Sequence, residues 1–170
     1  AEEYPEIPEF DESESFSVSQ SVLRNMINQT VFAVATNDTK PILTGELFEI
    51  ENGYFNVVAI DRYRLAVRNE SISADKDYRF VVPAKVLNEV SKLLKDDDDL
   101  TCVIHTCKKH IIFDISGYLV ISRLLEGEFH NYKGSIPKTS ATEVIVKKRE
   151  LISCLERASL LINVRIKSPV

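Results

Sequence analysis

The chain has 170 residues, of which 44% are hydrophobic and 28% charged, and its formal net charge is −5. This composition is ordinary for a globular domain with part of a second one. No apolar run approaches the roughly 20 residues of a membrane span, which argues against a helical membrane protein. The three cysteines, an odd number, fit free thiols in a reducing cytoplasm better than a disulfide framework.

The acidic residues are unevenly distributed along the chain. Residues 1–14 contain seven of them and no basic residue, and residues 96–99 are four consecutive aspartates. We expect residues 1–14 to be an acidic interdomain linker within a longer protein, of which this chain is an excerpt. The rest of the chain is close to charge balance, so a local basic surface for nucleic acid remains possible.

A repeat with an offset of 64 residues organises the sequence. Residues 16–23 read F-S-V-S-Q-S-V-L and residues 80–87 read F-V-V-P-A-K-V-L, with agreement at four positions. The same offset carries Gly53-Tyr54 onto Gly117-Tyr118, and a second step reaches V-I-V-K-K-R-E-L at 144–151. We interpret this single offset as structural duplication, with a third copy beginning near residue 144.

Each copy begins with a short strand, predicted at 16–18, 80–82 and 144–146, followed by an amphipathic helix. Pro83 lies just ahead of the second helix, where a proline is tolerated. The helices are predicted from apolar residues at i, i+3, i+4 and i+7 spacing, namely Val22, Leu23, Met26, Ile27 and Thr30; Val86, Leu87, Val90, Leu93 and Leu94; and Leu151, Ile152, Leu155, Ala158 and Ile162.

Three further strands are predicted after each of the first two helices. The first set covers 47–51, 54–60 and 63–71, and the second covers 100–106, 110–115 and 118–124. Asn52-Gly53 between two β-rich runs is a strong hairpin signal. The unit is therefore β-α-β-β-β, present twice, and it predicts an α+β domain in which two helices pack side by side on an antiparallel sheet.

Basic residues recur on the expected outer faces of the three helices. The first helix is expected to expose Ser21, Arg24, Asn25 and Asn28, the second Lys85, Asn88, Lys92 and Lys95, and the third Lys148, Arg149 and Arg157. Such cations either form an ordinary solvated helix face or face a phosphate backbone without reading bases.

Catalytic and metal-binding patterns are weak. Cys102, His105, Cys107 and His110 are zinc-ligand types, but in a strand Cys102 and His105 point to opposite faces. The odd number of cysteines, three, favours free thiols, so we expect core thiols and surface histidines rather than a metal or cofactor. Ser135 and Lys138 have the S-x-x-K spacing of a nucleophile pair, but Pro137 forbids the helical turn that it needs. We therefore expect that the protein is not an enzyme.

Four segments of the chain resemble the bacterial sliding clamp, the beta subunit of DNA polymerase III. They are L-T-G-E-L-F-E at 43–49, V-A-I-D-R-Y-R-L-A at 58–66, V-V-P-A-K-V-L-N-E at 81–89 and S-R-L-L-E-G-E-F-H-N-Y at 122–132. The resemblance covers the whole chain in order. It implies that 15–137 is the clamp's middle domain, with repeats of about 15–79 and 80–137, and that 138–170 is a linker and the truncated start of a third domain.

The resemblance also implies a function. Clamps of this family are homodimeric rings of duplicated β-α-β-β-β domains that encircle duplex DNA without catalysis. Their helices line the hole, which would make Arg24, the lysines of the second helix and the cations of the third face DNA. The alternative is a stand-alone protein-interaction module that uses the same docking pocket without DNA.

The family's docking pocket takes short peptides from polymerase, clamp-loader and repair proteins. By motif, the resemblance places it here at Lys40, Leu43, Ile60, Arg62, Tyr63, Arg64, Leu65, His130 and Ser135. Leu43, Ile60 and Leu65 are expected to hold apolar peptide anchors. Two departures from the family pattern stand out, since Arg62 replaces a glycine of the usual Thr-Asp-Gly turn and His130 replaces a proline.

Overall fold

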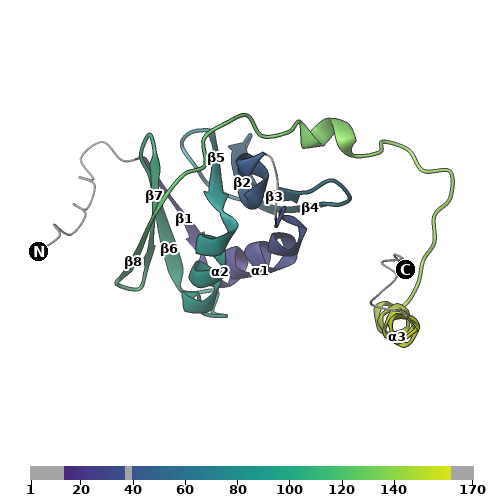
Figure 1. The fold of residues 1–170 in the computed structure, drawn as a ribbon. Coiled ribbons are helices and arrows are strands. Elements are labelled where there is room, and N and C mark those ends of the chain that lie inside the picture. The colour runs from purple at the N-terminus through teal and green to yellow at the C-terminus, as the bar shows by residue number, and fades with distance from the viewer. Residues whose placement is uncertain (1–13, 37–39, 162–170) are drawn as a thin grey trace, which may run out of the picture. The chain divides into compact units, whose positions relative to one another are not determined.

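In the computed structural model of the protein, residues 14–36 and 40–161 are described (Figure 1). All of the predicted acidic linker except its last residue, and Ile162 of the third helix, lie outside these residues. The chain divides into two compact units, Ala1–Tyr132 and Lys133–Val170.

The first unit contains the predicted β-α-β-β-β arrangement twice. The first copy consists of β1 (Glu14–Ser19), α1 (Gln20–Thr30), β2 (Gly45–Glu51), β3 (Tyr54–Ile60) and β4 (Leu65–Ser71), with 3-10 turns at Val31–Ala33 and Pro41–Thr44 between α1 and β2. The second copy consists of β5 (Tyr78–Pro83), α2 (Ala84–Leu93), β6 (Thr101–Thr106), β7 (His110–Ile115) and β8 (Tyr118–Arg123).

Local sequence explains where these elements begin and turn. Pro83 occupies the N-cap position of α2, just ahead of the helix as expected. Asn52 and Gly53 both have positive φ, as a two-residue hairpin turn between right-twisted strands requires, and Ser116 and Gly117 do the same between β7 and β8. The predicted elements of this unit are therefore confirmed, with small shifts at their ends.

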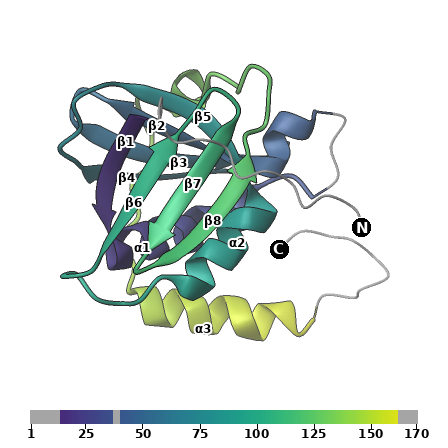
Figure 2. The same ribbon diagram turned by 90° about the vertical axis from the view of Figure 1, so that its left-hand side faces the viewer.

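The eight strands form two antiparallel sheets rather than the single sheet that the sequence suggested. One sheet has the order β1-β6-β7-β8 and the other has the order β4-β3-β2-β5 (Figure 2). The first strand of each repeat thus joins the sheet of the other repeat. Phe16 of β1 lies opposite Ile104 of β6, and Phe80 of β5 lies opposite Phe48 of β2. Neither repeat completes its sheet alone, so the two fold as one unit.

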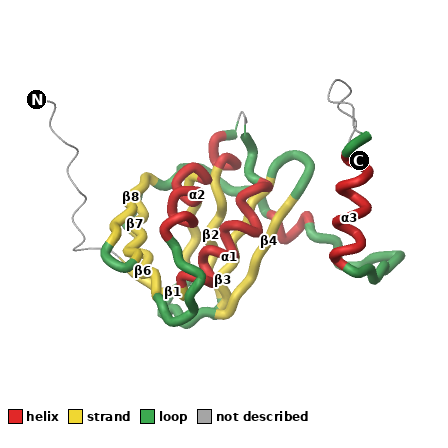
Figure 3. The backbone as a smooth tube through the Cα atoms, turned by 90° about the horizontal axis from the view of Figure 1, so that it is seen from below, coloured by secondary structure: helices red, strands yellow, loops and turns green. Residues whose placement is uncertain are grey.

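A shared core joins the two sheets and the two helices. The ring of Phe48 in β2 lies 5.2 Å from that of Phe55 in β3 and 6.5 Å from that of Phe113 in β7, in edge-to-face geometry. α1 and α2 lie side by side against the sheets (Figure 3), and their fully buried Leu23 and Leu87 belong to the same apolar cluster. The α+β class with paired helices is confirmed.

The 64-residue offset holds for only part of each repeat. It relates β1 to β5 and the start of α1 to the start of α2. It fails for the later strands, because Gly53 lies in the β2–β3 turn whereas Gly117 lies in the β7–β8 turn. The match of Gly53-Tyr54 with Gly117-Tyr118 therefore reflects two similar turns at different places in the repeat.

The second unit contains α3 (Lys148–Ser159), which begins 64 residues after α2 as the repeat predicts. The strand expected at 144–146 is absent: Val144, Ile145 and Val146 are exposed, and no described strand pairs with them. A strand needs a neighbour to satisfy its backbone hydrogen bonds, which explains the difference. None of the residues of α3 is buried.

Candidate functional site

A groove of about 380 Å³ lies on the first unit, where three separate segments meet. Five of the nine predicted pocket residues line it, namely Lys40, Leu43, Ile60, Arg62 and His130. Sequence motifs did not single out the other lining residues, which are Ile42, Asp61, Glu128, Phe129 and Asn131. The structure therefore brings together residues that are up to 91 positions apart in the chain.

The floor of the groove is the surface of a second apolar cluster, on the face of the β2–β3–β4–β5 sheet opposite the main core. Phe129 and Ile42 are buried in this cluster, while Leu43 and Ile60 pack against it and also line the groove. Leu65, predicted to form the floor, packs against the same cluster but does not line the groove.

The turn after β3 forms one wall, and Asp61 determines its shape. The Asp61 carboxylate accepts hydrogen bonds from the backbone N–H groups of Tyr63 (2.8 Å) and Arg64 (3.0 Å) and from Arg64 Nε (3.0 Å). Burial acts to raise the pKa of Asp61, but these hydrogen bonds and the Arg64 charge outweigh it and lower the pKa. The carboxylate is thus held ionised as the cap of the turn.

This turn directs its three bulky side chains to different places. Arg62 lines the groove. Arg64, predicted as a polar edge of the pocket, turns away, because Asp61 binds its Nε and its guanidinium lies 5.7 Å from the ring centre of Phe32. Tyr63 is 93% exposed at the tip and does not line the groove. Of these three side chains, only Arg62 therefore lines the groove.

The segment after β8 forms the opposite wall. Leu125 continues from β8 and donates its backbone N–H to the Val81 carbonyl at 2.9 Å. Gly45 makes room for it, since a Cβ there would lie 2.7 Å from Leu125 Cδ1 and 2.4 Å from the Val82 carbonyl oxygen. Gly127 then adopts a φ of 131°, which favours glycine, and the chain crosses over Ile42.

Tyr132 ends this wall and is buried in the apolar cluster. Its hydroxyl donates to Glu49 Oε2 at 2.6 Å, and Arg79 Nη1 donates to Glu49 Oε1. Burial, then the hydrogen bond to Glu49, raises the pKa of Tyr132 above its usual value, so the hydroxyl stays protonated as a donor. Ser135, the last predicted pocket residue, is exposed in the 3-10 turn Tyr132–Ser135 and belongs to the second unit.

The predicted DNA-facing residues of the first unit occupy α1, α2 and the bend that follows. Arg24 is half-buried on α1, whereas Lys85 and Lys92 are exposed on α2. Lys92 pairs with Glu89 at 2.7 Å. Lys95 is not on α2 as predicted, because the helix ends at Leu93.

Ser21 is buried, contrary to its expected place on the outer face of α1. Its hydroxyl donates to the Asp98 carboxylate of the four-aspartate run. This contact turns part of the run toward the start of α1, although Asp98 itself remains exposed in the bend after α2.

The cations of the second unit are exposed on α3. They are Lys148, Arg149 and Arg157. Arg157 donates hydrogen bonds to Ser153 Oγ at 2.7 Å and to the Cys154 sulfur at 3.2 Å, both one turn earlier on the helix.

The cysteine and histidine residues of β6 and β7 do not assemble a metal site. Cys102 is buried, and burial, reinforced by the negative charge of Asp114, raises the pKa of its thiol to about 12. Across the β6–β7 turn, Cys107 and His110 are linked through backbone atoms, N–H to carbonyl, at 2.9 Å. Across the described residues, no group of three or more His, Cys, Asp and Glu side chains is placed to hold a metal.

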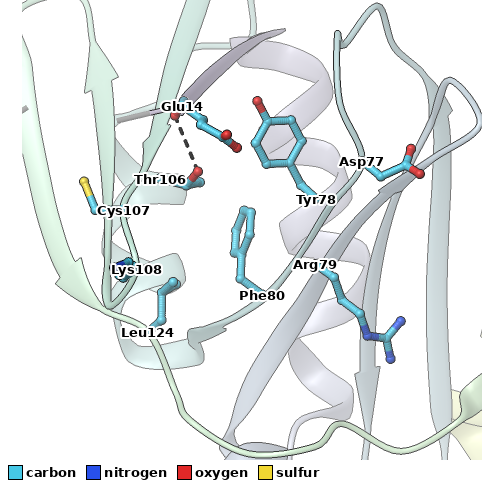
Figure 4. A pocket seen from close by; sticks show the side chains of 9 residues that line it. All are labelled: Glu14, Asp77, Tyr78, Arg79, Phe80, Thr106, Cys107, Lys108 and Leu124. Atoms are coloured by element: carbon cyan, nitrogen blue, oxygen red, sulfur yellow. Dashed lines mark hydrogen bonds between the residues drawn. The ribbon is translucent and has the colours of Figure 1, made fainter. Parts of the chain in front are cut away.

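A larger cavity, of about 770 Å³, lies where the start of β5 faces the start of β1 and the ends of β6 and β8 (Figure 4). The rings of Tyr78 and Phe80 point into it, and the Thr106 hydroxyl donates to the Glu14 carbonyl across one side. Its lining carries both carboxylates and cations. Because these residues come from strand ends far apart in sequence, no local motif marks the cavity.

Known proteins are similar to this chain in sequence and in structure. Residues 17–131 match the family described as DNA polymerase III beta subunit, central domain. The beta sliding clamp of Bacillus subtilis (strain 168) is 39% identical over 163 residues, which is 95% of this chain and 43% of that protein. The chain thus spans less than half the length of this curated relative. No helix in the described residues is long and apolar enough to cross a membrane.

Solved structures give the same result. The crystal structure of the DNA polymerase sliding clamp from Bacillus subtilis superposes with a TM-score of 0.90 at 36% identity, covering 95% of this chain and 43% of that one. The sliding clamp from Pseudomonas aeruginosa bound to griselimycin gives a TM-score of 0.86 at 29% identity, covering 95% and 44%.

The duplicated β-α-β-β-β unit, with paired helices and two sheets that exchange their first strands, is thus a DNA-clamp domain. Two independent comparisons, of sequence and of structure, agree on its relatives. The chain belongs to the DNA polymerase III beta subunit family, whose central domain it contains.

Proposed function

We propose that this chain is the middle part of a ring-shaped processivity clamp, which encircles duplex DNA and docks polymerase, clamp-loader and repair proteins. In this proposal residues 15–137 are the middle domain, and residues 138–170 are a linker and the start of a third domain. Two copies of the full-length protein close the ring in the cytoplasm. The observation that carries the proposal is the groove, in which five residues predicted from separate motifs converge.

The chemistry of the groove suits a short peptide. Leu43 and Ile60 offer an apolar floor of the kind that holds one or two aliphatic or aromatic anchors. Lys40, Arg62 and His130 place donors around it, and Asp61 and Glu128 add carboxylates. Such a rim can bind both the backbone and the charged side chains of a partner. A relative, the sliding clamp of Pseudomonas aeruginosa, has been solved with griselimycin bound.

The helix cations suit DNA that is enclosed rather than tightly bound. Arg24 on α1 and Lys85 and Lys92 on α2 are widely spaced, and α1 and α2 lie side by side. A ring holds DNA by topology, so a few phosphate contacts are enough, and salt screens them from distant acidic residues over about 8 Å. We assign the protein no catalytic role.

Peptide binding tests the groove. A fluorescein-labelled peptide with a Gln-x-x-Leu-Phe motif should bind the full-length protein, and Ile60→Ala should weaken binding by about 1–3 kcal/mol because it removes an anchor contact. Val67→Ala, on the outer strand β4 and outside the groove lining, is the control and should leave affinity unchanged. Equal affinity of wild type and Ile60→Ala would remove the groove assignment.

Polymerase processivity tests the DNA-facing helices. Lys85, Lys92 and Arg149 changed together to Glu should shorten the DNA made per binding event, because the ring interior becomes repulsive to phosphate, while peptide binding stays intact. Lys108→Glu, in the β6–β7 turn, serves as a single-charge control. Unaltered processivity in the triple variant would show that these lysines and arginine form only a solvated face.

The mass of the full-length protein in solution separates the clamp from a stand-alone interaction module. The clamp proposal requires a dimer that remains on circular DNA and slides off linear DNA. A monomer that binds the peptide but is not retained on circular DNA would favour the interaction module.

A further inference from the structure

Tyr132 and Glu49 lie beneath one wall of the groove without lining it. Residues Glu128–Asn131, which form that wall, directly precede Tyr132. The Tyr132 ring is buried in the apolar cluster, and its hydroxyl donates to Glu49 Oε2 at 2.6 Å. The wall is therefore joined at its C-terminal end to the middle of β2, next to the strand that carries Ile60.

A second contact, with Arg79, also holds Glu49 in place. It is 4% exposed on β2, and its second oxygen, Oε1, accepts from Arg79 Nη1 of β5. Arg79 can reach Glu49 because its guanidinium points away from the rings of Tyr78 and Phe80, toward the opposite face of β5 (Figure 4). Both carboxylate oxygens thus have donors, and a buried carboxylate held by two charge-assisted or short hydrogen bonds has little freedom to move.

Apolar packing and a backbone hydrogen bond also hold the wall. Phe129 is buried among apolar side chains, Gly127 lies over Ile42 at a distance that a Cβ would fill, and the Leu125 N–H donates to the Val81 carbonyl. Apolar packing resists withdrawal of the wall but is not directional, whereas a hydrogen bond fixes both distance and angle. The Leu125 bond holds the start of the wall, and the Tyr132–Glu49 bond therefore holds its other end, next to residues 128–131, which line the groove with Leu43 and Ile60.

We propose that Tyr132 and Glu49 are positioning residues of the groove, which set its width and so its affinity for peptides although neither touches the ligand. This inference rests on the proposed peptide-binding function of the groove. It predicts that removing one hydroxyl group outside the groove alters peptide binding more than it alters the fold.

The test compares Tyr132→Phe with Tyr78→Phe in the full-length protein. Tyr78 is a matched control, because it is also buried but lies in the main core on the other face of the sheet, and its hydroxyl makes a long 3.4 Å contact with the Ser15 carbonyl. Tyr132→Phe should raise the peptide Kd about tenfold, mainly through a faster off-rate. Tyr78→Phe should leave the Kd unchanged.

A double variant separates positioning from stability. Glu49→Met in the Tyr132→Phe background removes both buried polar partners, and Arg79, which is half exposed, is left to water. Thermal stability should return toward the wild-type value, since no buried group lacks a partner. The Kd should stay raised, because the bond that sets the wall is still missing. Recovery of affinity together with stability would overturn the proposal.

Hydrogen exchange of the backbone amides of residues 128–131 gives a readout that needs no peptide. Tyr132→Phe should speed exchange there and leave β6 and β7 unchanged. A uniform change across the unit, or none, would overturn the positioning role. If the wild-type protein binds no peptide, the proposed function fails on that result alone, while the exchange data still decide whether the pair positions the wall.

Discussion

The two β-α-β-β-β repeats of the first unit share one skeleton but differ in their connections. β1 and α1 correspond to β5 and α2 at a constant offset of 64 residues. Residues 31–44 connect α1 to β2, whereas the shorter segment 94–100 connects α2 to β6. Residues 61–64 join β3 to β4, whereas Ser116-Gly117 alone join β7 to β8. The groove is lined by residues at these longer connections and by residues 128–131, which follow β8, so duplication provided the scaffold and segments that differ between the copies or follow them line the groove.

The cores of the repeats differ at one equivalent pair of positions. Glu46 in β2 lies opposite Val82, and Cys102 in β6 lies opposite Val18, the residue that precedes Val82 by 64. Glu46 is fully buried and its Oε1 lies 2.9 Å from the Thr30 hydroxyl, while its Oε2 has no hydrogen-bond partner in the described structure. The position 64 residues after Thr30 is the buried Leu94. The first repeat thus contains a buried polar pair where the second is apolar.

The largest expected effect concerns the apolar core that the two repeats share. Leu23→Ala in α1 and Leu87→Ala in α2 remove equivalent, fully buried side chains, and each should lower the free energy of unfolding by about 2–5 kcal/mol. Because the sheets exchange strands, urea unfolding should remain a single transition in both variants. Two separate transitions, or a loss confined to one repeat's strands in hydrogen exchange, would contradict the shared core.

The next effect concerns Glu46, through the pH dependence of stability. Burial raises the pKa of Glu46 to about 8, with the Thr30 hydrogen bond opposing the rise. Because the folded-state pKa lies above the usual value of 4.5, the contribution of protonated Glu46 to the free energy of unfolding is complete below pH 4.5. This contribution is lost as pH rises toward 8. The slope should approach about 1.4 kcal/mol per pH unit within this window.

Glu46→Gln measures this contribution directly. The variant should lack the slope between pH 5 and 8 and should be more stable than wild type at pH 8, when both are unfolded in urea across that range. Cys102→Ser, at the equivalent position of the second repeat, should keep the wild-type slope. An identical pH profile for wild type and Glu46→Gln would show that Glu46 is ionised in the folded protein.

Exchanging turns between the repeats should have a smaller effect, mainly on the free energy of peptide binding. Replacing residues 61–64 with Ser-Gly should keep the hairpin, since Ile60 and Leu65 are already paired across it, and should change stability by no more than about 1 kcal/mol. Peptide binding should weaken by about 1–2 kcal/mol, because Arg62 and the Asp61-capped wall are lost. Full retention of affinity, measured by fluorescence anisotropy, would show that the longer turn does not build the site.

The smallest effect is expected on the solvent face of α2. Lys92→Ala removes an exposed ion pair with Glu89, which should change the free energy of unfolding by no more than about 0.5 kcal/mol. The matching change on α1, Asn28→Ala, should be equally small. A loss above 1 kcal/mol in thermal unfolding would mean that this face is packed rather than solvated.

The sequence was sufficient to predict the order and type of the elements in the first unit, because apolar periodicity and turn residues act locally. It could not predict the two sheets. Alternation in β1 and β5 determines which side chains are buried, as with Phe16 and Val82, but strand neighbours depend on long-range pairing. The strand expected at 144–146 shows the same limit, since β-propensity alone does not supply a partner.

The lining of the groove was predicted in part, and through motifs rather than through local physics. The resemblance identified Lys40 and His130, which no local pattern connects. It did not predict that Asp61 would bind Arg64 and turn it toward Phe32, because that outcome depends on one side chain capping the turn. The groove residues Phe129 and Asn131 and the Tyr132–Glu49 bond depend on how the segment after β8 crosses the sheet, which only the tertiary structure reveals.

The most direct test of the account is amide chemical-shift mapping of the isotopically labelled protein with saturating partner peptide. The account predicts that the largest changes fall on three segments of the groove, residues 40–44, 60–62 and 128–131, with the equivalent connections of the second repeat, 94–100 and 116–117, unaffected. Changes centred on the turns between β6, β7 and β8, or on the cavity between β5 and the end of β6, would contradict the claim that the longer connections of the first repeat and residues 128–131 together form the docking site.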